Sequence, residues 1–101
     1  MGIDVQLRSE TGDVLDSVDD GQMILSRATR QAFAGTNLLR YLEPWGDAMF
    51  NQAQSGDLMA DIRLIKETNP NTPLADLLSK VEPLVDRLSR ETHTYLWFVG
   101  D

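Results

Sequence analysis

Residues 94–101 read TYLWFVGD and decide the expected fold. Their apolar side chains alternate between two faces, with Tyr95, Trp97 and Val99 on one and Leu96 and Phe98 on the other. A strand that is apolar on both faces usually lies inside a sheet, between two neighbours. We therefore expect residues 94–99 to form a central strand that pairs with the first strand of the chain.

The other clear strand signal lies at the N-terminus. Ile3, Val5 and Leu7 alternate with polar residues, which is the period-two pattern of a strand with one wet face. A polar segment containing Gly12 follows, so the economical prediction is a hairpin whose second strand covers residues 13–18.

Helical patterns fill most of the middle and the second half of the chain. We expect a helix near 22–34, capped by Asp19 or Asp20, and another over 57–68. Thr72 and Pro73 are a capping hydroxyl and a first-turn proline, and they predict a helix over 73–91. Pro83 lies inside that helix, which predicts a kink or two abutting helices.

The segment between these helices is harder to interpret. Residues 38–42 have a strand-like pattern. Residues 43–46 read EPWG, which has proline at the second and glycine at the fourth position of a turn. Residues 48–54 fit a short returning strand or the first turns of a helix, and we favour the helix.

These elements predict a single α+β domain over residues 1–101. Its sheet would be small and mainly antiparallel, built from the N-terminal hairpin plus the C-terminal strand and covered by three or four helices. The apolar stripe from Leu74 to Leu88 is expected to pack in the core, although its near-heptad spacing is also typical of a helix-paired dimer.

The net charge of −7 and a pI near 4.5 argue against nucleic acid and anionic membrane surfaces as partners, because both require clustered Lys and Arg. A basic protein is the natural complement. The chain has no cysteine, no apolar segment long enough to span a bilayer and no signal-peptide pattern, so we expect a cytoplasmic protein.

Charge is unevenly distributed along the chain. Residues 1–20 carry six acids and one arginine, whereas residues 21–40 carry three arginines and no acid. The stretch 13–21, DVLDSVDDG, holds four of these acids, Asp13, Asp16, Asp19 and Asp20. It fails the spacing of a calcium loop, so we expect no metal there, but one helix cap and a solvated surface for a basic partner.

Trp45 in the EPWG turn is the most suggestive single residue. Its indole either folds back over the core or stands out as an aromatic anchor flanked by Glu43 and Asp47. Carboxylates around such an anchor would select a cationic partner, and Tyr41 is a second candidate of the same kind.

Signals of catalysis are weak in this sequence. The only histidine, His93, is expected to stabilise the end of the last helix, and Asp57 and Asp61 form a carboxylate pair without a local partner group. No serine elbow, phosphate-binding loop or dinucleotide fingerprint is present. We therefore predict no catalytic residue, no cofactor and no metal ligand, and an enzyme with a nonlocal site is the last of three alternatives.

Residues 45–51, WGDAMFN, in a small acidic chain with a closing apolar strand, partly resemble barstar-type immunity proteins. That resemblance implies inhibition of a basic nuclease by acidic side chains around an aromatic–glycine loop. The family has no N-terminal hairpin like residues 3–18, and no binding residue is transferred from it.

We accordingly predict a small acidic protein-binding module, with an immunity-like inhibitor of a basic protein as one form. Its candidate partner-binding residues are Trp45, Glu43, Asp47, Tyr41, Asp13, Asp16, Asp19 and Asp20. The alternative is a self-associating structural or regulatory subunit. In that case two copies would form a homodimer through a sheet edge or through the stripe from Leu74 to Leu88.

Overall fold

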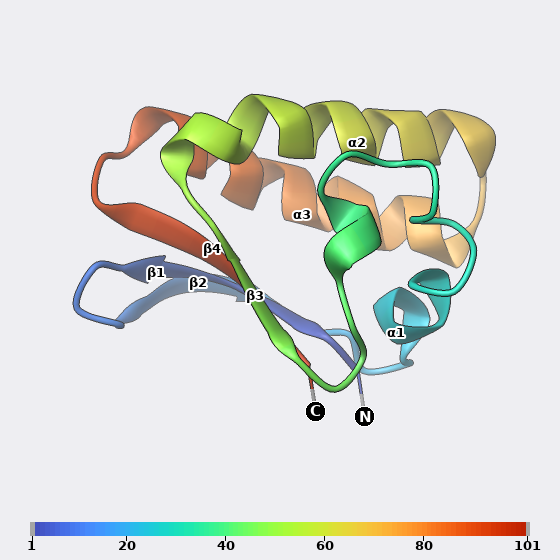
Figure 1. Cartoon of the computed structure of the whole chain (residues 1–101), viewed down its shortest axis with the longest axis horizontal. Coiled ribbons are helices and arrows are strands. Elements are labelled where there is room, and N and C mark those ends of the chain that lie inside the picture. Colours follow the sequence, from blue (N-terminus) through green and yellow to red (C-terminus); the bar gives the residue numbers. More distant parts are fainter. Residues whose placement is uncertain (1, 101) are drawn as a thin grey trace.

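The computed structural model describes residues 2–100, and in that range the chain forms a four-stranded antiparallel sheet with three α-helices, two of them long (Figure 1). The strands are β1 (Asp4–Ser9), β2 (Val14–Val18), β3 (Asp47–Phe50) and β4 (Thr94–Val99), in the spatial order β2-β1-β4-β3. The helices are α1 (Ile24–Ala28), α2 (Ser55–Thr68) and α3 (Pro73–Arg90), with short 3-10 turns η1 (Leu39–Tyr41) and η2 (Gln52–Gln54).

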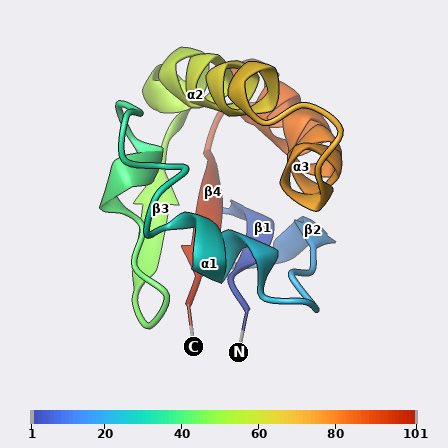
Figure 2. The same cartoon turned by 90° about the vertical axis from the view of Figure 1, so that its right-hand side faces the viewer.

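The molecule has two layers. Helices α2 and α3 lie side by side over one face of the sheet, and the opposite face carries no helix within residues 2–100 (Figures 1 and 2). The short helix α1 lies at the end of the sheet where β1 begins and β4 ends (Figure 2). None of the helices described is long and apolar enough to cross a membrane.

The central position of the last strand is confirmed. In β4, Leu96 pairs with Leu7 of β1 on one side and with Phe50 of β3 on the other. Leu96 and Phe98 face the helices and are buried, whereas Trp97 lies on the open face, where the Arg8 guanidinium stacks 4.6 Å from its ring centroid. The apolar residues on the second face are therefore only partly covered.

The N-terminal hairpin is also confirmed, and a bulge between Leu7 and Arg8 changes its register. Asp16 pairs with Leu7, so its side chain lies on the helix side of the sheet. There its carboxylate lies 3.9 Å from the Arg87 guanidinium of α3.

The predicted stripe of α3 forms the main wall of the core. Its buried members are Leu77, Leu78, Val81, Leu84, Val85 and Leu88. These side chains are buried inside the monomer, so the stripe packs in the core as expected. Pro83 lies within one continuous helix, and Thr72 caps that helix through a hydrogen bond from the Ala75 N–H (3.2 Å).

The first helix is much shorter than predicted. We expected a helix near 22–34, but α1 ends at Ala28 and the chain continues in tight turns, with the Phe33 N–H bonded to the Ala28 carbonyl (3.2 Å). This turn carries Phe33 into the core, where its side chain is fully buried. The gain from burying a phenylalanine outweighs the loss of one or two helical turns.

The predicted strand over 38–42 is wrong, and its place is taken by the 3-10 turn η1. Asp61 of α2 explains the change, because its buried carboxylate accepts hydrogen bonds from the N–H groups of Asn37 (2.9 Å), Leu38 (2.8 Å) and Leu39 (3.2 Å). Three amides that converge on one carboxylate adopt a helical start, not an extended strand.

Our preference for a helix over residues 48–54 is wrong for its first half. Asp47–Phe50 form β3, which completes the sheet beside β4, and the helical turn begins only after Asn51. Asn51 and Gln54 exchange side-chain and backbone hydrogen bonds as a capping box, which leads the chain into α2 at Ser55.

Candidate functional site

The turn at residues 43–46 presents Trp45 to solvent. The Gly46 N–H bonds to the Glu43 carbonyl (3.3 Å), and the indole of Trp45 is 77% exposed. The sequence left open whether this indole folds back over the core or points outward, and in the structure it points outward. Tyr41, also a candidate, is 65% exposed, and the Arg40 guanidinium lies 4.8 Å from its ring centroid.

The Trp45 turn is held against the end of β4. The Gly100 N–H donates to the Gly46 carbonyl (3.0 Å) and to Asp47 Oδ1 (3.2 Å). A Cβ on Gly100 would lie 2.7 Å from the Pro44 carbonyl oxygen, so only glycine allows this close approach. The backbone that carries the exposed indole is therefore fixed before any partner arrives.

Carboxylates gather at this end of the sheet. Asp4 and Asp47 both pair with Val99 from opposite sides, and Glu43 lies in the turn itself. Asp4 and Asp19 line a hollow of about 320 Å³ that also reaches Gly100. We call Asp4, Asp19, Glu43 and Asp47 the acidic end.

The structure brings together only two of the four acids of residues 13–20, Asp19 and Asp20. Asp13 closes the hairpin turn at the opposite end of the sheet, where its carbonyl accepts from the Ser9 N–H (2.9 Å). Asp16 is drawn toward Arg87, and Asp20 is only 3% exposed. Asp19 and Asp20 both line the hollow beside Asp4, and of these two only Asp19 is exposed.

Asp20, one of the two predicted caps, does bind the first amides of α1, although the N-cap position itself is Met23, whose side chain makes no capping hydrogen bond. The Asp20 carboxylate accepts backbone N–H groups from Ile24 (2.6 Å), Leu25 (2.8 Å) and Ser26 (3.3 Å) at the start of α1. It also accepts the N–H of Ile3 (3.2 Å), which ties α1 to the start of the first strand. This carboxylate is therefore structural and unavailable to a partner.

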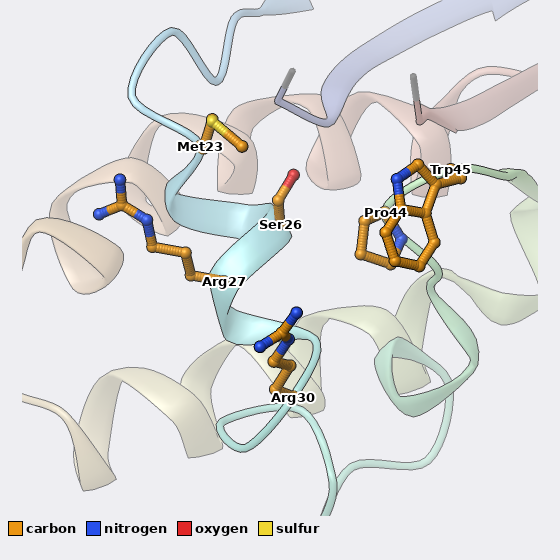
Figure 3. A pocket seen from close by; sticks show the side chains of 6 residues that line it. All are labelled: Met23, Ser26, Arg27, Arg30, Pro44 and Trp45. Carbon is orange, nitrogen blue, oxygen red and sulfur yellow. The ribbon is translucent and has the colours of Figure 1, made fainter.

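A second hollow, of about 420 Å³, lies between α1 and the Trp45 turn (Figure 3). We call it the arginine hollow, and its lining residues are Met23, Ser26, Arg27, Arg30, Pro44 and Trp45. None of these is an acid. In Figure 3, Arg30 extends into the space below Ser26 and opposite the Trp45 ring, whereas Arg27 extends away from the indole.

Met23 joins the two hollows, since it lines both of them. Its side chain is 41% exposed and its backbone has φ of 59°, a left-handed conformation that few non-glycine residues adopt. Because it lines both hollows, Met23 belongs to the candidate surface together with Trp45.

Sequence reasoning missed Asp4, Met23, Arg27 and Arg30 as parts of this surface. The signal for the arginines was visible, because residues 21–40 hold three arginines and no acid. Their position beside the Trp45 turn depends on the tertiary fold. Asp4 reaches the turn only because β4 lies between β1 and β3.

The other titratable candidates have structural surroundings. His93 was expected to stabilise the end of the last helix. It lies exposed at the hairpin end, where its Nδ1 is 3.2 Å from Glu10 Oε2. The Asp61 carboxylate accepts the three backbone N–H groups at the start of η1, so it does not form a carboxylate pair with the exposed Asp57. Within residues 2–100, no group of three metal-ligating side chains is close enough together to hold a metal ion.

One ion pair lies far from this surface, at the end of α3. Arg87 Nε donates to Glu91 (2.7 Å), and this hydrogen bond holds the pKa of Glu91 below its usual range. The same bond raises the pKa of Arg87. Both side chains face solvent, so the pair is a local support for the helix end.

Comparisons of the chain with models of protein families, with curated proteins and with solved structures gave no match.

Proposed function

We propose that this protein is a small binding module that engages a basic partner protein through Trp45 and the acidic end. The observation that carries the proposal is the 77% exposed indole on a turn fixed by Gly100. Exposing a tryptophan to water costs free energy that burial against a partner would recover. Tryptophan is also the residue type most enriched among binding hot spots.

The carboxylates around the indole suggest the sign of the partner's charge. Asp4, Asp19, Glu43 and Asp47 come from four different segments and converge at one end of the sheet. With a net charge of −7 behind them, they would steer a cationic surface toward the indole. An immunity-like inhibitor of a basic protein is the specific form we favour, and a cytoplasmic location remains a prediction from the sequence.

The proposed surface is narrower than the set of residues predicted from the sequence. Asp20 is buried, Asp16 lies beside Arg87 on the helix side of the sheet, and Asp13 lies at the far end of the sheet. Tyr41 is exposed, with its hydroxyl bonded to Arg40 (2.8 Å). We therefore expect Trp45 to contribute more binding energy than any of these four.

The test is affinity capture from the native cell, followed by measurement of binding kinetics with the captured protein. Trp45→Ala should weaken binding by at least about 30-fold, the loss typical of a hot spot. Leu64→Ala, which removes another exposed apolar side chain on α2, is the matched control and should leave affinity unchanged. A Trp45→Ala variant that binds as well as the control would refute the anchor.

Salt dependence tests the acidic end separately. The association rate should fall steeply between about 50 and about 500 mM salt, because screening shortens the range of the carboxylates. Replacing Asp4, Asp19 and Asp47 together by Asn should reduce the rate at low salt and flatten this dependence. A rate that ignores salt in the unaltered protein would remove the charge argument.

Self-association is the second candidate, and the open face of the sheet favours it. Val14 and Met49 are exposed there on the two edge strands, with Trp97 between them under Arg8. Light scattering at micromolar concentration separates the two proposals. A tight homodimer would favour self-association, and a monomer would favour a foreign partner.

A further inference from the structure

We propose that the arginine hollow binds a small organic anion that carries a planar ring. The anionic group would lie at Arg30, and the ring would lie against the indole of Trp45. This inference goes beyond the proposed partner binding, because the ligand class is a small molecule and the charge preference is opposite. The two proposals share only the indole.

The first argument is the state of the two arginines. Lys66, Arg87 and Arg90 form ion pairs with carboxylates, while Arg8 and Arg40 lie over aromatic rings. The other four basic residues, Arg27, Arg30, Arg63 and Lys80, have no such partner among residues 2–100, and of these Arg27 and Arg30 line the arginine hollow. In a chain with 16 acids and 9 basic residues, two unpaired guanidinium groups on the wall of one hollow are available for an external anion.

The second argument is that, among residues 2–100, no carboxylate lines this wall. The six lining residues include two cations and no acid, although the acidic end begins on the other side of Met23. The charged side chains on this wall are therefore positive in a protein of strongly negative net charge. Unscreened by a neighbouring carboxylate on the same wall, they can attract an anion into the hollow.

The third argument is the apolar part of the hollow. Trp45, Pro44 and Met23 provide a flat ring, a second ring and a flexible thioether chain. An exposed indole stacks on planar rings, and methionine adapts to their edges. A volume of about 420 Å³ lies within the usual range for small-molecule sites.

Each wall then has a separate task. In Figure 3, Arg30 extends toward the centre of the hollow, opposite Trp45, so its planar fork can bind a carboxylate or phosphate with two parallel hydrogen bonds. Arg27 lies on the rim and adds positive potential. Carboxylate and phosphate share this chemistry, and the experiment distinguishes them.

The experiment is a titration followed by the indole N–H signals in a ¹⁵N NMR spectrum. The chain has two tryptophans, so Trp45 reports on the hollow and Trp97, which does not line it, reports on the open face of the sheet beside Arg8. The probes are AMP for a ring with phosphate and indole-3-acetate for a ring with carboxylate. Adenosine and inorganic phosphate supply the ring alone and the anion alone.

We expect AMP, indole-3-acetate or both to shift the Trp45 signal saturably, at a Kd of about 1 mM or tighter, and to leave Trp97 unmoved. Adenosine and phosphate should each bind at least about tenfold more weakly. Arg30→Gln should weaken the binding at least about tenfold, since it removes a charge-assisted hydrogen bond. Arg63→Gln on α2, another exposed arginine, is the matched control and should change nothing.

Three results would overturn the inference: neither ring-bearing anion shifts Trp45, adenosine shifts it as strongly as AMP, or Arg30→Gln binds as well as Arg63→Gln. An unmoved Trp97 signal in each variant shows that the fold is intact. No partner protein is present, so this outcome is independent of the proposed partner binding. Conversely, failure of partner capture would leave the titration unaffected.

Discussion

Replacing Asp20 by alanine should destabilise this protein more than any substitution on its charged surface. The Asp20 carboxylate is 3% exposed and accepts four backbone N–H groups, from Ile3, Ile24, Leu25 and Ser26, at 2.6–3.3 Å. These donors belong to two segments that are far apart in sequence. The carboxylate therefore holds the start of β1 against the start of α1.

The expected magnitude follows from those four bonds. Loss of an N-cap carboxylate costs about 1 kcal/mol, and each buried N–H left without a partner adds about 1–3 kcal/mol. At least the amides of Ile3 and Leu25 belong to fully buried residues, where water enters with difficulty. We therefore expect Asp20→Ala to lower the free energy of unfolding by about 3–5 kcal/mol, a large share of the 5–15 kcal/mol typical of a domain.

Urea titration followed by circular dichroism measures this loss directly, and the thermal midpoint should fall by at least about 12 °C. Asp20→Asn keeps one acceptor oxygen and should lose roughly half as much. Asp19→Ala is the matched control, since Asp19 is exposed and should change stability by no more than about 0.5 kcal/mol. The reasoning fails if Asp20→Ala costs less than about 1 kcal/mol, or no more than Asp19→Ala.

Three further predictions concern single contacts. Gly100→Ala should push the adjoining turn away and shift the Trp45 indole N–H signal, because its Cβ meets the turn carbonyls; an unmoved signal would mean that the turn is not held there. Met23→Gly should raise the free energy of unfolding by about 1 kcal/mol through relief of the left-handed backbone, and an unchanged urea midpoint would contradict this. Arg87→Gln should raise the pKa of Glu91 toward its usual value in an NMR titration. The pKa of Glu91 is lowered in the folded protein, so the ion pair stabilises the fold at pH values above the ordinary carboxyl range. This stabilisation is lost as the pH falls through the pKa that Glu91 has in the folded protein. The variant should therefore show a smaller loss of stability with acid.

Several elements were predictable because their cause is local. The apolar residues on both faces of 94–99 require two strand neighbours, and β4 has them. The start of α3 is set locally, because Thr72 accepts the Ala75 N–H three residues later and Pro73 is the first helical residue. Asp20 could be assigned as a cap because it stands immediately before a helical pattern, although its bond to Ile3 was not foreseen.

The errors share a different cause. The first helix ends early because Phe33 enters the core, and residues 37–39 form a turn because Asp61, more than twenty residues later, binds their amides. Residues 47–50 become a strand because β4 offers them an edge. In each case a contact distant in sequence outweighs a modest local preference.

The candidate surface divides in the same way. From the sequence alone follow the charge of the chain, the segregation of acids and arginines along it, and the presence of one tryptophan in a proline–glycine turn. Only the tertiary structure decides that Asp13 and Asp16 lie away from Asp19, that Asp4 and Asp47 meet across Val99, and that Arg30 and Trp45 line one hollow. The physical reason is that backbone pairing and core burial are worth more than the interactions of exposed charges, so the charges are carried to wherever the sheet and the core place them.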